Sequence, residues 1–122
     1  MNSIGWFEIP VQDMDRAVKF YEAVFGQKLQ LSEMDNFQMA MFPWEEAGAG
    51  ASGALVKGEG YIPSHQGTVV YFNCAEGLQQ ELDRVEPNGG QVLIAKMSIG
   101  EYGFVAHFED TEGNRVALHS ME

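Results

Sequence analysis

The sequence predicts an α+β fold made of two tandem βαβββ units, in which a strand, a helix and three further strands occur twice. Three observations predict this fold. Residues 4–26 have the pattern of one complete strand, turn and helix. A shift of 64 residues places the Gly, Gln and Leu that follow this helix on the same residue types in the second half. Short β-branched and aromatic runs of strand length then follow in both halves.

The first unit begins with residues 4–11, which are apolar at nearly every position, as is typical of a strand covered on both faces. Asp13 can accept a hydrogen bond from the first helical turn, and Gly26 can end the helix in a left-handed conformation. Between them, apolar side chains recur at helical spacing: Met14, Ala17, Val18, Tyr21, Val24 and Phe25. The three strands that complete the unit are expected at 27–32, 37–42 and 53–57.

The second unit repeats this order, with an opening strand at 68–74 and a helix at about 77–86. Its last three strands are expected at 91–96, 103–109 and 115–120. The turn at 110–114, DTEGN, joins the last two strands, and its Gly and Asn are expected to supply positive φ. The chain is therefore expected to be one domain, 1–122, with a first unit at 1–60 and a second unit at 65–122.

Length and composition limit the classes of function. A chain of 122 residues with 45% hydrophobic residues can bury one substantial core. Its net charge of −11 opposes contact with nucleic acid and with anionic membranes, which are both bound first through basic patches. No run approaches the roughly 18 apolar residues of a membrane span, and no secretory signal is recognisable, so a cytoplasmic location is expected. The single cysteine, Cys74, excludes an internal disulfide and is expected to be a small buried residue.

Three segments together resemble the vicinal oxygen chelate superfamily: FEIPVQDMDRAVKFYEAVFG at 7–26, NGGQV at 88–92 and DTEGNRVALH at 110–119. This superfamily includes lactoylglutathione lyases, extradiol dioxygenases, fosfomycin resistance proteins and bleomycin-binding proteins. The chain is most similar in type to its short members related to lactoylglutathione lyase. The resemblance implies a curved eight-stranded mixed sheet around a cavity, with the helices outside, and a homodimer.

The resemblance also implies where a metal would be held. In the metal-dependent relatives, His and Glu side chains from the first and last strands of each unit bind the cation. Those positions fall at or beside Trp6, on Thr68, on Ala117 and on Ala54 or Leu55. None of these side chains is an imidazole, carboxylate or thiolate donor. We therefore expect no cofactor, and the alternative is a divalent metal such as Ni, Zn, Mn or Fe at a shifted site.

The candidate ligand-binding residues are Trp6, Glu8, Trp44, Thr68, His107 and His119. Alternation along a strand puts Glu8 on the face of Trp6, and His119 on the face of Ala117, so both are expected to point into the cavity. The two tryptophans can stack on a flat or cationic molecule. The competing interpretation is that Trp6 only fills the hollow, and that each histidine is a structural residue with satisfied hydrogen bonds.

These observations support three hypotheses, because the fold alone does not decide the function. The first is a small-molecule-binding protein without a metal, similar to the bleomycin-binding branch, that sequesters a flat or cationic organic compound. The alternative is a metal-dependent lyase, isomerase or dioxygenase with an atypical ligand set of Glu8, His107 and His119. The third is an interaction module with a vestigial cavity.

Overall fold

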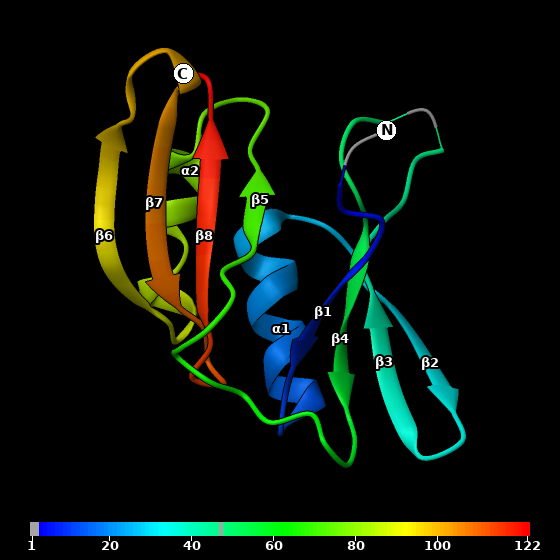
Figure 1. The fold of residues 1–122 in the computed structure, drawn as a ribbon. Helices are drawn as coiled ribbons and strands as arrows, with labels where there is room; N and C mark the ends of the chain where they lie inside the picture. Colours follow the sequence, from blue (N-terminus) through cyan, green and yellow to red (C-terminus); the bar gives the residue numbers. More distant parts are fainter. Residues whose placement is uncertain (1–2, 47) are drawn as a thin grey trace.

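The computed structural model describes residues 3–46 and 48–122 (Figure 1). The elements of the first half are β1 (Phe7–Pro10), α1 (Met14–Phe25), β2 (Gln30–Met34), β3 (Phe37–Met41) and β4 (Gly53–Lys57). Those of the second half are β5 (Tyr71–Asn73), α2 (Gln79–Asp83), η1 (Glu86–Asn88), β6 (Gln91–Ser98), η2 (Gly100–Tyr102), β7 (Phe104–Glu109) and β8 (Arg115–Ser120). Within the described residues, no helix has the length and apolar character needed to cross a membrane.

The tandem βαβββ architecture predicted from the sequence is confirmed, and its strands pair as two four-stranded sheets. The strand orders are β1-β4-β3-β2 and β5-β8-β7-β6. In each sheet the first strand of the unit runs parallel to the fourth, and the other neighbours are antiparallel. Figure 1 shows β1 and β5 as the facing edges of the two sheets. In the part of the chain that the structure describes, no ladder joins β1 to β5, so a gap in hydrogen bonding interrupts the eight strands.

Helix α1 forms where the sequence predicts it and supplies the centre of the core. The Asp13 side chain accepts a hydrogen bond from the Arg16 backbone N–H at 3.0 Å, and Gly26 ends the helix with φ of 65°. The buried face consists of Met14, Ala17, Phe20, Tyr21 and Val24. It packs on residues of both units, as in the Phe20–Phe108 pair with ring centroids 5.9 Å apart. The two units therefore share one hydrophobic core.

The largest departures from the expected boundaries concern the second helix, strand β2 and the two opening strands. Gly77 has a left-handed φ of 94°, so the helix begins later than expected, at Gln79. At its end the Arg84 N–H bonds to the Glu81 carbonyl, three residues back, and the chain continues into the 3₁₀ helix η1. Strands β1 and β5 are edge strands and are shorter than predicted, and edge strand β2 runs from Gln30 to Met34 instead of the expected 27–32. Cys74 is buried as expected, and burial together with the nearby Glu81 carboxylate raises the pKa of its thiol to about 12.

Candidate ligand-binding groove

A groove with a volume of about 570 Å³ lies between the facing edges of the two sheets. One wall is the start of β1 and the segment that leads into it, with Ile4, Trp6 and Glu8, and the other wall is residues 68–73. The wall atoms are mostly apolar, and the volume lies within the roughly 300–1,000 Å³ that small-molecule sites occupy. The groove is therefore of a size and character suited to a small organic molecule.

Glu8 places a carboxylate in the first wall. Phe7 and Ile9 pack on the core, so Trp6 and Glu8 point away from the helices, as the alternation predicted. The Trp6 indole N–H donates to Glu8 Oε2 at 3.2 Å, and the Tyr61 hydroxyl donates to Glu8 Oε1 at 2.8 Å. The hydrogen bond to Glu8 raises the pKa of Tyr61. Each carboxylate oxygen has a second lone pair, so this ordered but exposed group can still accept from a bound molecule.

Tyr71 and His107 meet over Ala117 on the second sheet. Ala117 pairs with Tyr71 of β5 on one side and with His107 of β7 on the other. The Tyr71 hydroxyl lies 3.0 Å from His107 Nε2, and their rings are edge to face with centroids 5.4 Å apart. Arg115 Nε donates to His107 Nδ1 at 3.1 Å. Burial, and secondarily the Arg115 charge, lower the pKa of His107.

The remaining candidate residues are distributed around the groove. Thr68 is exposed in its second wall, whereas Trp44 is 67% exposed and lines an adjoining hollow beside Phe72. His119 lies with His107 in a hollow on the second sheet, and its Nε2–H donates to the Tyr102 carbonyl at 2.6 Å. The structure thus brings Trp6, Glu8 and Thr68 together. Their role in binding a ligand, and that of Trp44, His107 and His119, stays a prediction.

The side chains at the expected metal positions do not fit a divalent cation. Among residues 3–46 and 48–122, no group of three His, Cys, Asp or Glu residues is placed to hold one. Ala54 lies opposite Glu8 in the β1–β4 ladder and adds no donor, and Leu55 is part of the core. Both nitrogens of His107 already have protein partners. Glu8, the remaining carboxylate of the groove, is bound to Trp6 and Tyr61 instead.

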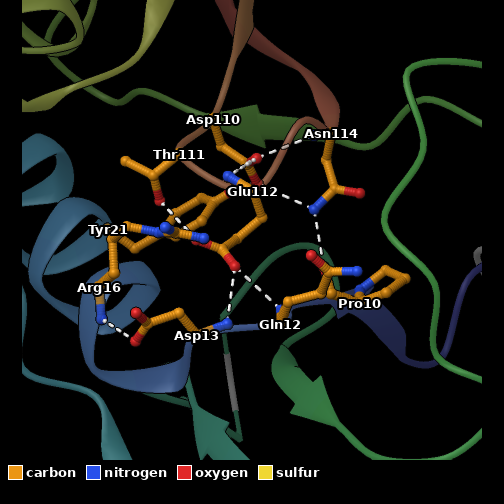
Figure 2. Close-up of polar contacts among 9 residues, drawn as sticks. All are labelled: Pro10, Gln12, Asp13, Arg16, Tyr21, Asp110, Thr111, Glu112 and Asn114. Atoms are coloured by element: carbon orange, nitrogen blue, oxygen red, sulfur yellow. Dashed lines mark hydrogen bonds and ion pairs between the residues drawn. The ribbon is translucent and has the colours of Figure 1, made fainter.

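The turn between β7 and β8 fixes the end of the first wall (Figure 2). The Asn114 Nδ2 group donates to the Pro10 carbonyl at 2.8 Å, and Asn114 Oδ1 accepts from the Ser64 backbone N–H at 3.0 Å. Gly113 has the positive φ expected for this turn, but Asn114 does not, so that part of the prediction was wrong. Asn114 instead acts through its side chain, which also donates to buried Asp110 at 3.0 Å. Asp110 accepts a hydrogen bond from the Tyr21 hydroxyl at 2.6 Å. Burial raises the pKa of Asp110, and this effect outweighs the hydrogen bonds from Tyr21 and Asn114, which lower it.

Glu112 connects the same turn to the start of α1, as Figure 2 shows. Its Oε1 accepts from the backbone N–H groups of Gln12 and Asp13 at 2.9 and 2.8 Å, and Arg16 Nε donates to its Oε2 at 2.7 Å. The Glu112 side chain is 0% exposed. Burial alone would raise its pKa, but the hydrogen bonds from Arg16, Asp13 and Gln12 prevail and lower the pKa to about 2. The turn therefore holds the end of β1, the segment around Ser64 between β4 and β5, and the start of α1 in one arrangement.

Comparison with known proteins identifies the family. The model of the Glyoxalase/Bleomycin resistance protein/Dioxygenase superfamily matches residues 3–118. The chain belongs to this superfamily. A glyoxylase-like domain-containing protein of Didymella fabae is 34% identical over 126 aligned positions, which cover 94% of this chain and 91% of that protein.

Solved structures of the superfamily share the fold at low sequence identity. A glyoxylase/bleomycin resistance protein/dioxygenase domain from Frankia sp. EAN1pec superposes with a TM-score of 0.75 at 15% identity, covering 98% of each chain. A glyoxalase I variant from Zea mays superposes with a TM-score of 0.68 at 19% identity. The alignment covers 96% of this chain but 45% of the Zea mays chain, so this chain spans about half the length of that enzyme.

Sequence reasoning missed three groups that contact the candidate residues Glu8 and His107. Tyr61 was not among the candidate residues, and its hydroxyl donates a hydrogen bond to Glu8. Tyr71 and Arg115 were not singled out, although both contact His107. No local pattern in 68–74 indicates that Tyr71 lies beside Ala117, because that pairing depends on the register of β5 against β8.

Proposed function

We propose that this chain binds a flat, cationic small organic molecule in the groove between β1 and β5 and sequesters it without chemical change. The observation that supports the proposal is the pairing of an indole with an ordered carboxylate in one wall of a groove of about 570 Å³. A positive group is attracted both by the face of an aromatic ring and by a carboxylate. Trp6 and Glu8, which lie side by side in the groove wall, can therefore both attract the positive group of a bound molecule.

The character of the groove supports binding over catalysis. Membership of the superfamily is compatible with both, since its members include binders and enzymes. In this chain Trp6, Thr68 and Ala117 stand at positions where the metal-dependent relatives have ligands. Glu8 is the acidic residue in the lining of the groove, and the chain as a whole carries a net charge of −11. Both charges attract a cationic molecule. The net charge also favours the approach of a cation over that of an anion.

The test compares two probes that differ by one charge, 1-methylquinolinium and its neutral isostere 1-methylnaphthalene. Titration monitored by tryptophan fluorescence gives both dissociation constants. We expect the cation to bind more tightly by up to about fivefold, since an exposed charge pair contributes roughly 0.2–1 kcal/mol. Glu8→Gln should remove most of this preference while leaving the binding of 1-methylnaphthalene unchanged.

The matched control is Glu33→Gln, which removes the same charge from exposed strand β2, outside the lining of the groove. It should keep the preference for the cation. If Glu33→Gln and Glu8→Gln reduce the preference equally, net charge and not the groove is responsible. If neither probe binds the unmodified protein, the proposed function is wrong.

We further propose that the chain forms a homodimer, as the family resemblance implies. Large apolar side chains stay exposed on the face of the second sheet that adjoins the groove, including Met97 at 47% and Ile99 at 38%. Exposed apolar clusters of this kind favour contact with another protein surface. A second copy of the chain is the partner that the superfamily suggests.

A further inference from the structure

Tyr71 stands where the groove meets the hollow on the second sheet. The residue lines both and is 49% exposed, and its hydroxyl lies on the side of the hollow, next to His107. Among the described residues, the hydrogen-bond partner of its hydroxyl is His107 Nε2, at 3.0 Å. The direction of this one hydrogen bond decides whether the Tyr71 proton is used inside the protein or remains available to a bound molecule.

The Arg115 side chain fixes that direction. Arg115 Nε–H lies 3.1 Å from His107 Nδ1 and can only donate, because a guanidinium has no acceptor. His107 Nδ1 must then be the unprotonated nitrogen, and a neutral imidazole carries its proton on the other nitrogen, Nε2. Nε2–H therefore donates to the Tyr71 oxygen. If Tyr71 donated instead, both ring nitrogens would lack a proton, which requires an imidazolate.

We propose that Tyr71 is the specificity-determining donor of the groove and recognises an acceptor oxygen, such as a carbonyl oxygen, on the bound molecule. The hydrogen bonds run in one direction, from Arg115 to His107, from His107 to Tyr71 and from Tyr71 to the guest. Hydrogen bonds in such a chain polarise and strengthen one another. Among the described residues, His107 is the one hydrogen-bond partner of the Tyr71 hydroxyl, so the hydroxyl proton remains available to a bound molecule.

The small side chain of Ala117 makes this arrangement possible. Ala117 lies between Tyr71 and His107 in the sheet and is 0% exposed. Cross-strand neighbours on one face are close enough to touch, so the two larger side chains meet above the methyl group. A longer side chain at 117 would separate the Tyr71 hydroxyl from His107 and break the chain of hydrogen bonds.

The inference rests on the proposed function and narrows its ligand class. Glu8 in the first wall accepts hydrogen bonds and attracts a cation, whereas Tyr71 in the second wall donates. The guest that suits both walls is a flat molecule with a cationic group at one side and an acceptor oxygen at the other. The polarity of the groove thus fixes the orientation in which such a molecule lies.

The test uses two probes that share the cation and the ring system, 6-acetyl-1-methylquinolinium and 6-isopropenyl-1-methylquinolinium. They are nearly isosteric, and only the first has a carbonyl oxygen. We expect the acetyl probe to bind about fivefold more tightly, the gain that one net hydrogen bond gives. Tyr71→Phe should abolish this preference, and the carbonyl stretching frequency of the acetyl probe should be higher when it is bound to this variant than when it is bound to the unmodified protein.

The matched control is Tyr102→Phe, which removes an exposed hydroxyl that takes no part in the chain of hydrogen bonds from Arg115 to Tyr71. This variant should keep the preference for the acetyl probe. Arg115→Met tests the role of Arg115 as a positioning residue. In ¹⁵N spectra of the histidine rings, His107 should be protonated on Nε2 in the unmodified protein and should lose that fixed tautomer in Arg115→Met. The same variant should reduce the preference for the acetyl probe.

Two failures are distinguishable. If the unmodified protein binds both probes equally, or if Tyr71→Phe retains the preference, the role of Tyr71 is wrong and the proposed function stands. If neither probe binds, the proposed function is wrong and this inference falls with it.

Discussion

Removing the charge of Glu112 should lower the free energy of unfolding of the protein. Its pKa of about 2 lies below the ordinary value of 4.5, and each pKa unit corresponds to about 1.4 kcal/mol. The full difference represents about 3 kcal/mol, but the ion-pair partner Arg16 is 51% exposed, so solvent screens part of it. We expect Glu112→Gln to lower the free energy of unfolding at pH 7 by about 2 kcal/mol.

The sign of the pH dependence provides the sharper test. A carboxylate with a lowered pKa in the folded state stabilises fully above the unfolded-state pKa, and that stability is lost as the pH falls from 4.5 towards about 2. The stability difference between the unmodified protein and Glu112→Gln should therefore shrink across this range. Asp110, whose pKa is raised, titrates in both proteins, so its contribution largely cancels from the difference.

Urea unfolding, followed by circular dichroism at several pH values between 7 and 3, measures this difference. Glu101→Gln is the control, because Glu101 is exposed on η2 and hydrogen-bonds to nothing in the network around Glu112. Its stability should match that of the unmodified protein. A loss in Glu112→Gln that is as large at pH 3 as at pH 7 would refute the reasoning, because the charge would then not be its cause.

Two further predictions concern packing and assembly. Gly53→Ala would push a methyl group into the carbonyl oxygen of Phe7 in the neighbouring strand, so it should lower the free energy of unfolding in urea by roughly 1–3 kcal/mol. The control is Gly5→Ala, which should leave that free energy unchanged because nothing lies within 4 Å of the added methyl group. Equal stability of the two variants would contradict the β1–β4 register. Sedimentation equilibrium should give twice the chain mass of 13.5 kDa, and a monomer at all concentrations would contradict the proposed homodimer.

The sequence predicts those parts of the fold that local signals determine. Asp13 and Gly26 bound α1 correctly because a cap and a left-handed glycine act on neighbouring backbone. The strand at 53–57 lies at its predicted position, since it is paired on both sides and buried. The bounds of β1 and β5 were wrong, because the length of an edge strand depends on a partner that the local pattern does not show.

The candidate site was predictable in part, for the same reason. Alternation put Trp6 and Glu8 on one face, and the structure agrees. The contact of Glu112 with the start of α1 joins residues about 100 positions apart, and no pattern in the turn indicates it. The hydrogen bond between Tyr71 and His107 likewise depends on the register of three strands across Ala117.

The proposed ligand site is the groove between β1 and β5. The chain has two tryptophans, Trp6 in the groove wall and Trp44 in the adjoining hollow, so its ¹H–¹⁵N spectrum contains two indole signals that a Trp44→Phe variant assigns. Titration with 1-methylquinolinium should shift the Trp6 indole signal saturably, because that N–H bonds to Glu8. A saturable shift of the Trp44 signal with the Trp6 signal unmoved, or no shift of either signal, would contradict ligand binding in the groove between β1 and β5.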